Sequence, residues 1–250
     1  MVHKRLPFRD PRTVARDIPG VLDMLFPRLA GGLVSSLNRD AFEFDAITAV
    51  PKENIEQSLL QKALLFELAV VRAEHILNGD KNPNWGMCIE AATKRQSKHY
   101  DANLPGTVEK NDMNVADHAA KNLVEMLECV SKQQPDDVLV FSPKIPGMGW
   151  IASGNGDFSL GKTLIEVKHT SRNFGSGDFR QVLMYWILKY AGSIENNDDI
   201  WTDCLLLNPR RNSGLRVNFD RLSRAASTSL GRVELCELLQ TITRRGRMEN

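Results

Sequence analysis

Two acidic side chains and one lysine lie close together in the C-terminal half of the chain. They are Asp157, Glu166 and Lys168, at the ends of the segment DFSLGKTLIEVK. If Gly161 and Lys162 form a two-residue hairpin turn, with glycine supplying the positive φ of its first position, Asp157 lies opposite Glu166. The β-carbons of such a pair are about 5 Å apart, and Lys168 follows two residues later on the same face.

Two carboxylates placed directly opposite each other destabilise a sheet unless something offsets their repulsion. A bound divalent cation, a lysine or a shared proton can do this. Mg²⁺ suits such a site because it accepts one or two carboxylates and keeps its other positions for water and phosphate oxygens. We expect Mn²⁺ to substitute for it. The residue types therefore predict metal-assisted hydrolysis of a phosphodiester, with Lys168 orienting the attacking water or stabilising the developing charge.

A Glu-x-Lys pair on a strand is common, and most such pairs are solvated surface charges. The alternation of the hairpin argues for a site, because it places Phe158, Leu160, Ile165 and Val167 on one face and all three polar groups on the other. The strand reads as a central one, and unpaired charges are costly in a central strand.

The elements around the hairpin alternate between helix and strand. Residues 11–78 are predicted to be mainly helical, including a helix over 55–77, and residues 79–113 form an irregular connection with a short helix near 87–98. The later elements are a helix from an Asn114 cap to about Val130, strands at 138–142, 150–153, 157–160 and 163–168, a helix at 178–190, strands at 204–208 and 215–219, and a helix at 233–243. This order predicts an α/β fold with a mixed sheet and helices on its faces, preceded by a mainly helical region of residues 1–112.

The hairpin residues resemble the PD-(D/E)XK nuclease superfamily, which has the restriction-endonuclease-like fold. The match consists of Asp157 after Gly-Asn-Gly, then Glu166 and Lys168 around Val167 at the end of an apolar strand. The next helix contains Gln181 and Tyr185, which look like the Gln-x-x-x-Tyr element of the RecB-like and lambda-exonuclease-like branches. These two residues are four apart, so they share a helix face that could meet the polar face of the hairpin.

The resemblance covers roughly residues 114–220 and implies an αβββαβ core within a nuclease-like domain of residues 113–250. It implies a DNA substrate, Mg²⁺ as cofactor, and a role in restriction, anti-phage defence or repair. An ATPase, helicase or other defence-system subunit is a compatible partner, and so is a second copy of the chain. The alternative is a catalytically silent module of the same fold that binds nucleic acid or a protein.

Several assignments stay open at the level of sequence. Pro135-Asp136-Asp137 precedes a predicted strand, so Asp136 or Asp137 could replace Asp157 as metal ligand; the hairpin register favours Asp157. The superfamily often supplies a further acid from the preceding helix, for which Glu125 is the first candidate and Glu128 the second. Contacts to the DNA backbone are expected from the basic side chains that flank the site in sequence, namely Arg172, Arg180 and Arg210.

Composition sets the broad class of the protein. Hydrophobic residues make up 42% and charged residues 25%, which is the balance of an ordinary globular protein. The net charge of +1 predicts no nucleic-acid affinity from charge alone, so affinity must come from local clusters. No apolar run is long enough to cross a bilayer, and a cytoplasmic location without membrane contact is the expectation.

Overall fold

The computed structural model describes residues 8–97, 107–196 and 199–245. Its helices are α1 (Pro11–Asp17), α2 (Val21–Leu25), α3 (Gly31–Leu37), the 3-10 helix η1 (Asn38–Asp40), α4 (Lys52–Glu56), α5 (Lys62–Leu77), α6 (Trp85–Gln96), α7 (Lys110–Gln133), α8 (Ser176–Asn196), α9 (Phe219–Ala226) and α10 (Arg232–Arg245). Its strands are β1 (Leu139–Phe141), β2 (Lys144–Ile145), β3 (Gly154–Asn155), β4 (Phe158–Leu160), β5 (Thr163–Val167), β6 (Asp203–Asn208) and β7 (Ser213–Asn218).

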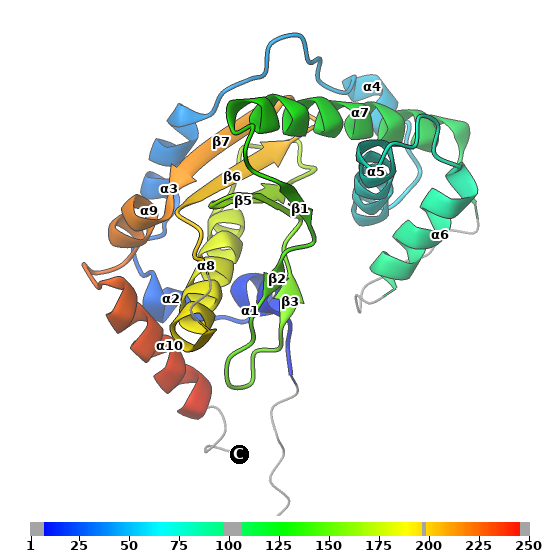
Figure 1. Cartoon of the computed structure of the whole chain (residues 1–250). Coiled ribbons are helices and arrows are strands. Elements are labelled where there is room, and N and C mark those ends of the chain that lie inside the picture. The colour runs from blue at the N-terminus through cyan, green and yellow to red at the C-terminus, as the bar shows by residue number, and fades with distance from the viewer. Residues whose placement is uncertain (1–7, 98–106, 197–198, 246–250) are drawn as a thin grey trace, which may run out of the picture.

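The fold is α/β, with a mixed sheet as predicted. In the described part of the chain, five strands form this sheet in the order β1-β4-β5-β6-β7. Only β5 and β6 run parallel, and α8 makes the crossover between them. The other neighbours are antiparallel. Strands β2 and β3 pair separately beside it. The long helices α7 and α8 cover opposite faces of the sheet (Figure 1).

The hairpin of β4 and β5 has the predicted register. Phe158 pairs with Ile165 and Leu160 with Thr163, and Gly161 has the positive φ, +50°, that the turn requires. Phe158 and Ile165 are fully buried in the core beneath α7, whereas Leu164 faces the core beneath α8. Each fully buried side chain of this size contributes about 1.5–3 kcal/mol relative to an exposed one, and a shift of one residue would reverse both faces.

The first helix packs against α8, on one side of the sheet. Val14, Leu22 and Leu25 of α1 and α2 belong to the same hydrophobic core as α8. The core around α8 contains residues from both ends of the chain. The hydrophobic cores therefore do not follow the predicted division at residue 113. The packing of α1 against α8 matters for function, since it brings the side chains of α1 to the end of β5.

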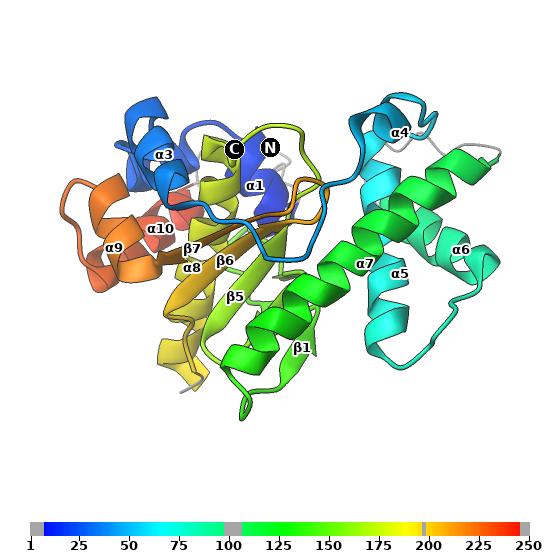
Figure 2. The same cartoon turned by 90° about the horizontal axis from the view of Figure 1, so that it is seen from above.

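A third core joins α5, α6 and the N-terminal half of α7 into a helical lobe, which lies beyond the edge of the sheet (Figure 2). Arg72 of α5 links these helices: it bonds Asp117 of α7 at 2.5 Å and lies 4.0 Å from the centre of the Trp85 ring of α6. The short helix expected near 87–98 is α6. Among the described helices, none has both the length and the apolar character needed to span a bilayer.

The continuous helix predicted over 55–77 is wrong, because the chain leaves the helix between α4 and α5. Asp112 of α7 explains the break: it accepts hydrogen bonds from Ser58 Oγ at 2.6 Å and from the backbone N–H of Leu59 at 3.0 Å. This buried tertiary partner compensates for the lost helical bonds. Asp112 also bonds the N–H of Glu109, so α7 begins there and not at the predicted Asn114 cap.

The strand predicted at 150–153 is also wrong. Ile151 makes only isolated bridges, to Arg9 and Met148, and its burial in the α8 core accounts for the apolar pattern there. The helix α9 was not predicted; Asn218 caps it by accepting the Arg221 N–H at 3.2 Å.

Candidate active site

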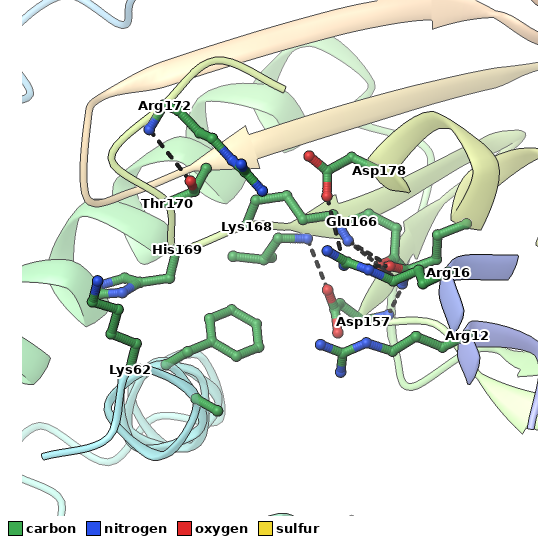
Figure 3. A pocket seen from close by; sticks show the side chains of 14 residues that line it. Arg12, Arg16, Lys62, Asp157, Glu166, Lys168, His169, Thr170, Arg172 and Asp178 are labelled. Carbon is green, nitrogen blue, oxygen red and sulfur yellow. Dashed lines mark hydrogen bonds and ion pairs between the residues drawn. The ribbon is translucent and has the colours of Figure 1, made fainter. Parts of the chain in front are cut away.

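The polar face of the hairpin lies at the floor of a cavity of about 240 Å³ at the carboxyl end of β5. Four parts of the chain line it: α1, α5, the end of the hairpin with the loop that follows, and the start of α8. Figure 3 shows Asp157 in the middle, with Arg12 and Arg16 of α1 on one side and Lys62 of α5 on the other.

Reciprocal hydrogen bonds hold the two carboxylates side by side. The N–H of Asp157 donates to Glu166 Oε1 at 3.3 Å, and the N–H of Val167 donates to Asp157 Oδ2 at 2.8 Å. Asp157 Oδ1 meets no hydrogen-bond donor in the described part of the chain. Glu166 is 1% exposed, and its burial, together with the charge of Asp157, raises the pKa of Glu166 to about 8. Asp157 thus presents an oxygen without a hydrogen bond next to Glu166, a carboxyl group whose pKa is raised.

Lys168 and Gln181 complete the polar network. The Lys168 amine donates to Glu166 Oε2 at 3.3 Å and to Gln181 Oε1 at 2.9 Å. The Gln181 amide nitrogen donates to Glu166 Oε2 at 2.7 Å and to the Tyr185 hydroxyl at 3.1 Å. All four side chains are buried. The sequence therefore placed Asp157, Glu166, Lys168, Gln181 and Tyr185 correctly in one cluster, and Gln181 fixes the direction of the lysine.

The donor set fits a magnesium ion. Carboxylate oxygens are the ligands that Mg²⁺ prefers, and one or two suffice because water and phosphate oxygens fill its other positions. Among the described residues, no group of three or more acidic, histidine or cysteine side chains is arranged to hold a metal. Asp157 and Glu166 would therefore hold the ion as a pair.

The other predicted ligands lie elsewhere. Glu125 is exposed on α7, across the sheet from the site, and lines a different hollow with Asp117 and His118. Asp136 and Asp137 lie in the turn between α7 and β1. Asp137 lies against Gly161 of the hairpin turn, at the opposite end of the hairpin from the cavity. The structure thus leaves Asp157 as the leading acid and does not bring Glu125 to the site.

Glu67 of α5 is the acid that sequence analysis missed. It lines a hollow that adjoins the site and shares Arg12, Arg16 and Phe66 with it. Burial raises the pKa of Glu67 to about 7, and the charge of Asp157 contributes, so the two carboxyl groups sense each other. Only tertiary packing brings α5 here; a helical Glu ninety residues from Asp157 carries no sequence signal.

The three predicted DNA-contacting arginines have different surroundings. Arg172 lines the cavity and is exposed. Arg180 faces away and forms an ion pair with Asp23 of α2. Arg210 is part-buried and lies outside the cavity lining. The structure adds cations that the sequence did not indicate: Arg12, Arg16 and Lys62. Arg16 bonds Gln181 at 3.3 Å and pairs with Asp178 at 3.6 Å, so it belongs to the network.

Comparison of the chain with models of known protein families, with curated proteins and with solved structures found no match. The function of the chain must therefore be inferred from the geometry of the site.

We expect Gln181→Leu to damage both the site and the fold. The change leaves the buried Lys168 and Glu166 without a shared partner, which costs about 1–3 kcal/mol of unfolding free energy, and it frees the lysine to move. Cleavage should fall by about tenfold to a hundredfold, by analogy with the loss of one oriented donor. Chemical denaturation and single-turnover cleavage rates measure the two effects.

Tyr185→Phe is the matched control, because it removes only one acceptor from the Gln181 amide. It should cost no more than about 1.5 kcal/mol and leave cleavage near the wild-type rate. A Gln181→Leu protein that cleaves as fast as wild type would show that the glutamine does not position Lys168.

Proposed function

We propose that this chain is a magnesium-dependent nuclease that hydrolyses phosphodiester bonds in DNA, with a restriction-endonuclease-like arrangement of its sheet. One observation carries the proposal: a buried Glu166 beside Asp157, with Lys168 directed by Gln181, at the floor of a cavity with cations at its mouth. A buried carboxyl group beside a second, partly buried one is costly without a ligand, and active sites are where such perturbed groups gather.

Each residue has a distinct task in the hydrolysis. A bound Mg²⁺ supplies a Lewis acid that neutralises charge on the phosphoryl group and lowers the pKa of a water. Asp157 and Glu166 would hold it. Lys168 donates hydrogen bonds toward the attacking water or a phosphate oxygen. The water oxygen forms a bond to phosphorus, the bond from phosphorus to the leaving oxygen breaks, the water loses its proton to solvent and the leaving oxygen gains one.

Unpaired cations around the mouth favour a phosphate-rich substrate. Arg12, Lys62 and Arg172 line the cavity from α1, α5 and the loop after β5 (Figure 3). All three residues are exposed, and their side chains make no hydrogen bond or ion pair with any described residue. Such cations oppose the repulsion between the acidic floor and a DNA backbone.

The direct test is cleavage of linear and circular DNA, single- and double-stranded, with and without Mg²⁺. The proposal expects magnesium-dependent products from at least one substrate, lost when a chelator is added. Absence of cleavage for every substrate with a folded protein would count against it.

Removing one of the three cations should weaken DNA binding and its salt dependence. Arg12→Ala, Lys62→Ala or Arg172→Ala should each lower affinity several-fold and reduce the slope of log K against log salt by about 1, since each lost phosphate contact releases one counterion fewer. Fluorescence anisotropy titrations over a salt series, in Ca²⁺, measure both. Arg180→Ala is the control, because its side chain is engaged by Asp23; an equal loss there would mean that general surface charge binds DNA.

Glu67→Gln should slow cleavage by roughly tenfold without harming the fold. Glu67 lies beside the site and interacts electrostatically with Asp157, so its removal changes how strongly the site attracts a cation. Glu125→Gln is the matched control, an exposed glutamate on the far side of the sheet. Cleavage rates measured over a Mg²⁺ series give the result; equal rates for Glu67→Gln and wild type would exclude Glu67 from the site.

A further inference from the structure

An aromatic wall stands next to the proposed metal site and has no task in the hydrolysis described above. It consists of Phe66 of α5 and His169, whose ring centres are 6.4 Å apart. Both residues line the same cavity as Asp157 and Glu166. Phe66 is only partly buried, so part of its side chain remains accessible from the cavity.

His169 behaves as aromatic surface and not as a charged group. Both of its ring nitrogens are buried and lack a hydrogen-bond partner among the described residues. Burial, together with the charge of Arg210, lowers the pKa of His169 to about 4, so the ring is neutral at physiological pH. His169 lies two residues beyond Val167, the last paired residue of β5, and lines the cavity.

A cation, Lys62, lies on the same helix face as Phe66 of the aromatic wall. Lys62 and Phe66 are four residues apart on α5 and therefore share one face of the helix. Ala63 of the same helix also lines the cavity, and its small side chain leaves room there. Proteins that bind single strands use this pairing of a basic contact for the backbone with an aromatic side chain on which a base stacks.

The small cavity favours a single strand over a duplex. Its floor, Glu166, is 1% exposed, and the side chains of α1 and of α5 lie on two sides of Asp157 (Figure 3). A cavity of about 240 Å³ admits part of one strand. In a duplex the base faces are also stacked on one another and are not available to Phe66.

We propose that Phe66 is a stacking platform for a base beside the scissile phosphate, so that the site selects single-stranded DNA, including frayed ends and flaps. This inference rests on the proposed nuclease function. Phe66 is a specificity residue in this scheme: it holds the nucleotide whose phosphate meets the carboxylates, and Lys62 holds the adjacent backbone.

The test compares binding of a labelled single strand with binding of the same sequence as a blunt duplex, by fluorescence anisotropy in Ca²⁺. Wild type should bind the single strand at least about tenfold more tightly, and Phe66→Leu should lose about tenfold for the single strand, as expected for one stacked base. Phe66→Trp should keep the preference, because it restores an aromatic face. Leu59→Ala, an 83% exposed apolar residue of the same lobe outside the cavity, is the control and should bind like wild type.

The melting temperature of each variant reports folding, and Phe66→Met replaces Phe66→Leu if the leucine protein is unstable. Equal binding of strand and duplex by wild type, or unchanged binding by a folded Phe66→Leu or Phe66→Met protein, would overturn the inference. Cleavage in Mg²⁺ is measured in parallel and separates the two proposals. Cleavage that depends on Glu166 but is indifferent to Phe66 removes only the stacking role, whereas failure to cleave or bind any DNA removes both.

Discussion

Glu166→Gln is expected to lower magnesium-dependent cleavage by roughly a thousandfold while leaving the fold intact. Loss of the ion removes several kcal/mol of transition-state stabilisation, and each 1.4 kcal/mol or so is a factor of ten in rate. The fold should survive because glutamine resembles the protonated form of Glu166, the form that burial and Asp157 favour up to a pH of about 8. The amide oxygen can still accept from Lys168 and from Gln181, and the 3.3 Å bond from the N–H of Asp157 is the one that is lost.

Cleavage rates and thermal unfolding at pH 7, measured on the same preparation, test both parts. Glu125→Gln is the control, since it makes the same chemical change on an exposed helix face remote from the cavity. If the Glu166→Gln protein were folded and still cleaved DNA at a rate within a few-fold of wild type, Glu166 would not hold the catalytic ion.

The metal-free protein should lose stability as the pH rises from about 5 to 8, and a divalent cation should reverse the loss. The pKa of Glu166 is raised from 4.5 to about 8, and that of Glu67 to about 7, so the folded state binds these protons more tightly than the unfolded chain does. The stabilisation is complete below the unfolded pKa and disappears as the pH passes the folded values. For Glu166 the slope is at most about 1.4 kcal/mol per pH unit.

A bound cation replaces the proton, so its effect has the opposite dependence on pH. Millimolar Ca²⁺ should raise the melting temperature little at pH 6 and more at pH 8, where less work is needed to deprotonate Glu166. Differential scanning calorimetry at the two pH values gives the comparison. Glu166→Gln should show a flatter pH dependence and no response to Ca²⁺. A wild-type protein that responds equally at both pH values would contradict this assignment of the proton.

Local patterns in the sequence predicted the hairpin and the helix that follows it. The alternation from Phe158 to Val167, with a glycine at the turn, allows only one register that buries the apolar face. Gln181 and Tyr185 share one helical face, and the sequence predicted that this face could meet the polar face of the hairpin. These inferences succeeded because each depends on residues within one or two adjacent elements.

The predictions of secondary structure were wrong where a residue far away in the sequence determines the local conformation. The break between α4 and α5 depends on Asp112, more than fifty residues away, and the apolar run around Ile151 is buried by α8 without forming a strand. The second half of the site was missed for the same reason. Arg12, Lys62 and Glu67 reach the cavity only because α1 packs on α8 and α5 packs on α7. Periodicity predicts that these segments are helices but not where they dock.

Direct measurement of cation binding tests the central claim, that Asp157 and Glu166 hold one divalent ion. Mn²⁺ is titrated into the protein at pH 8 without DNA, and free Mn²⁺ is followed by electron paramagnetic resonance. We expect one bound ion per chain in wild type and in Asp137→Asn, and loss of that ion in Asp157→Asn and Glu166→Gln. Binding that is equal in all four proteins, or absent from wild type, would contradict it.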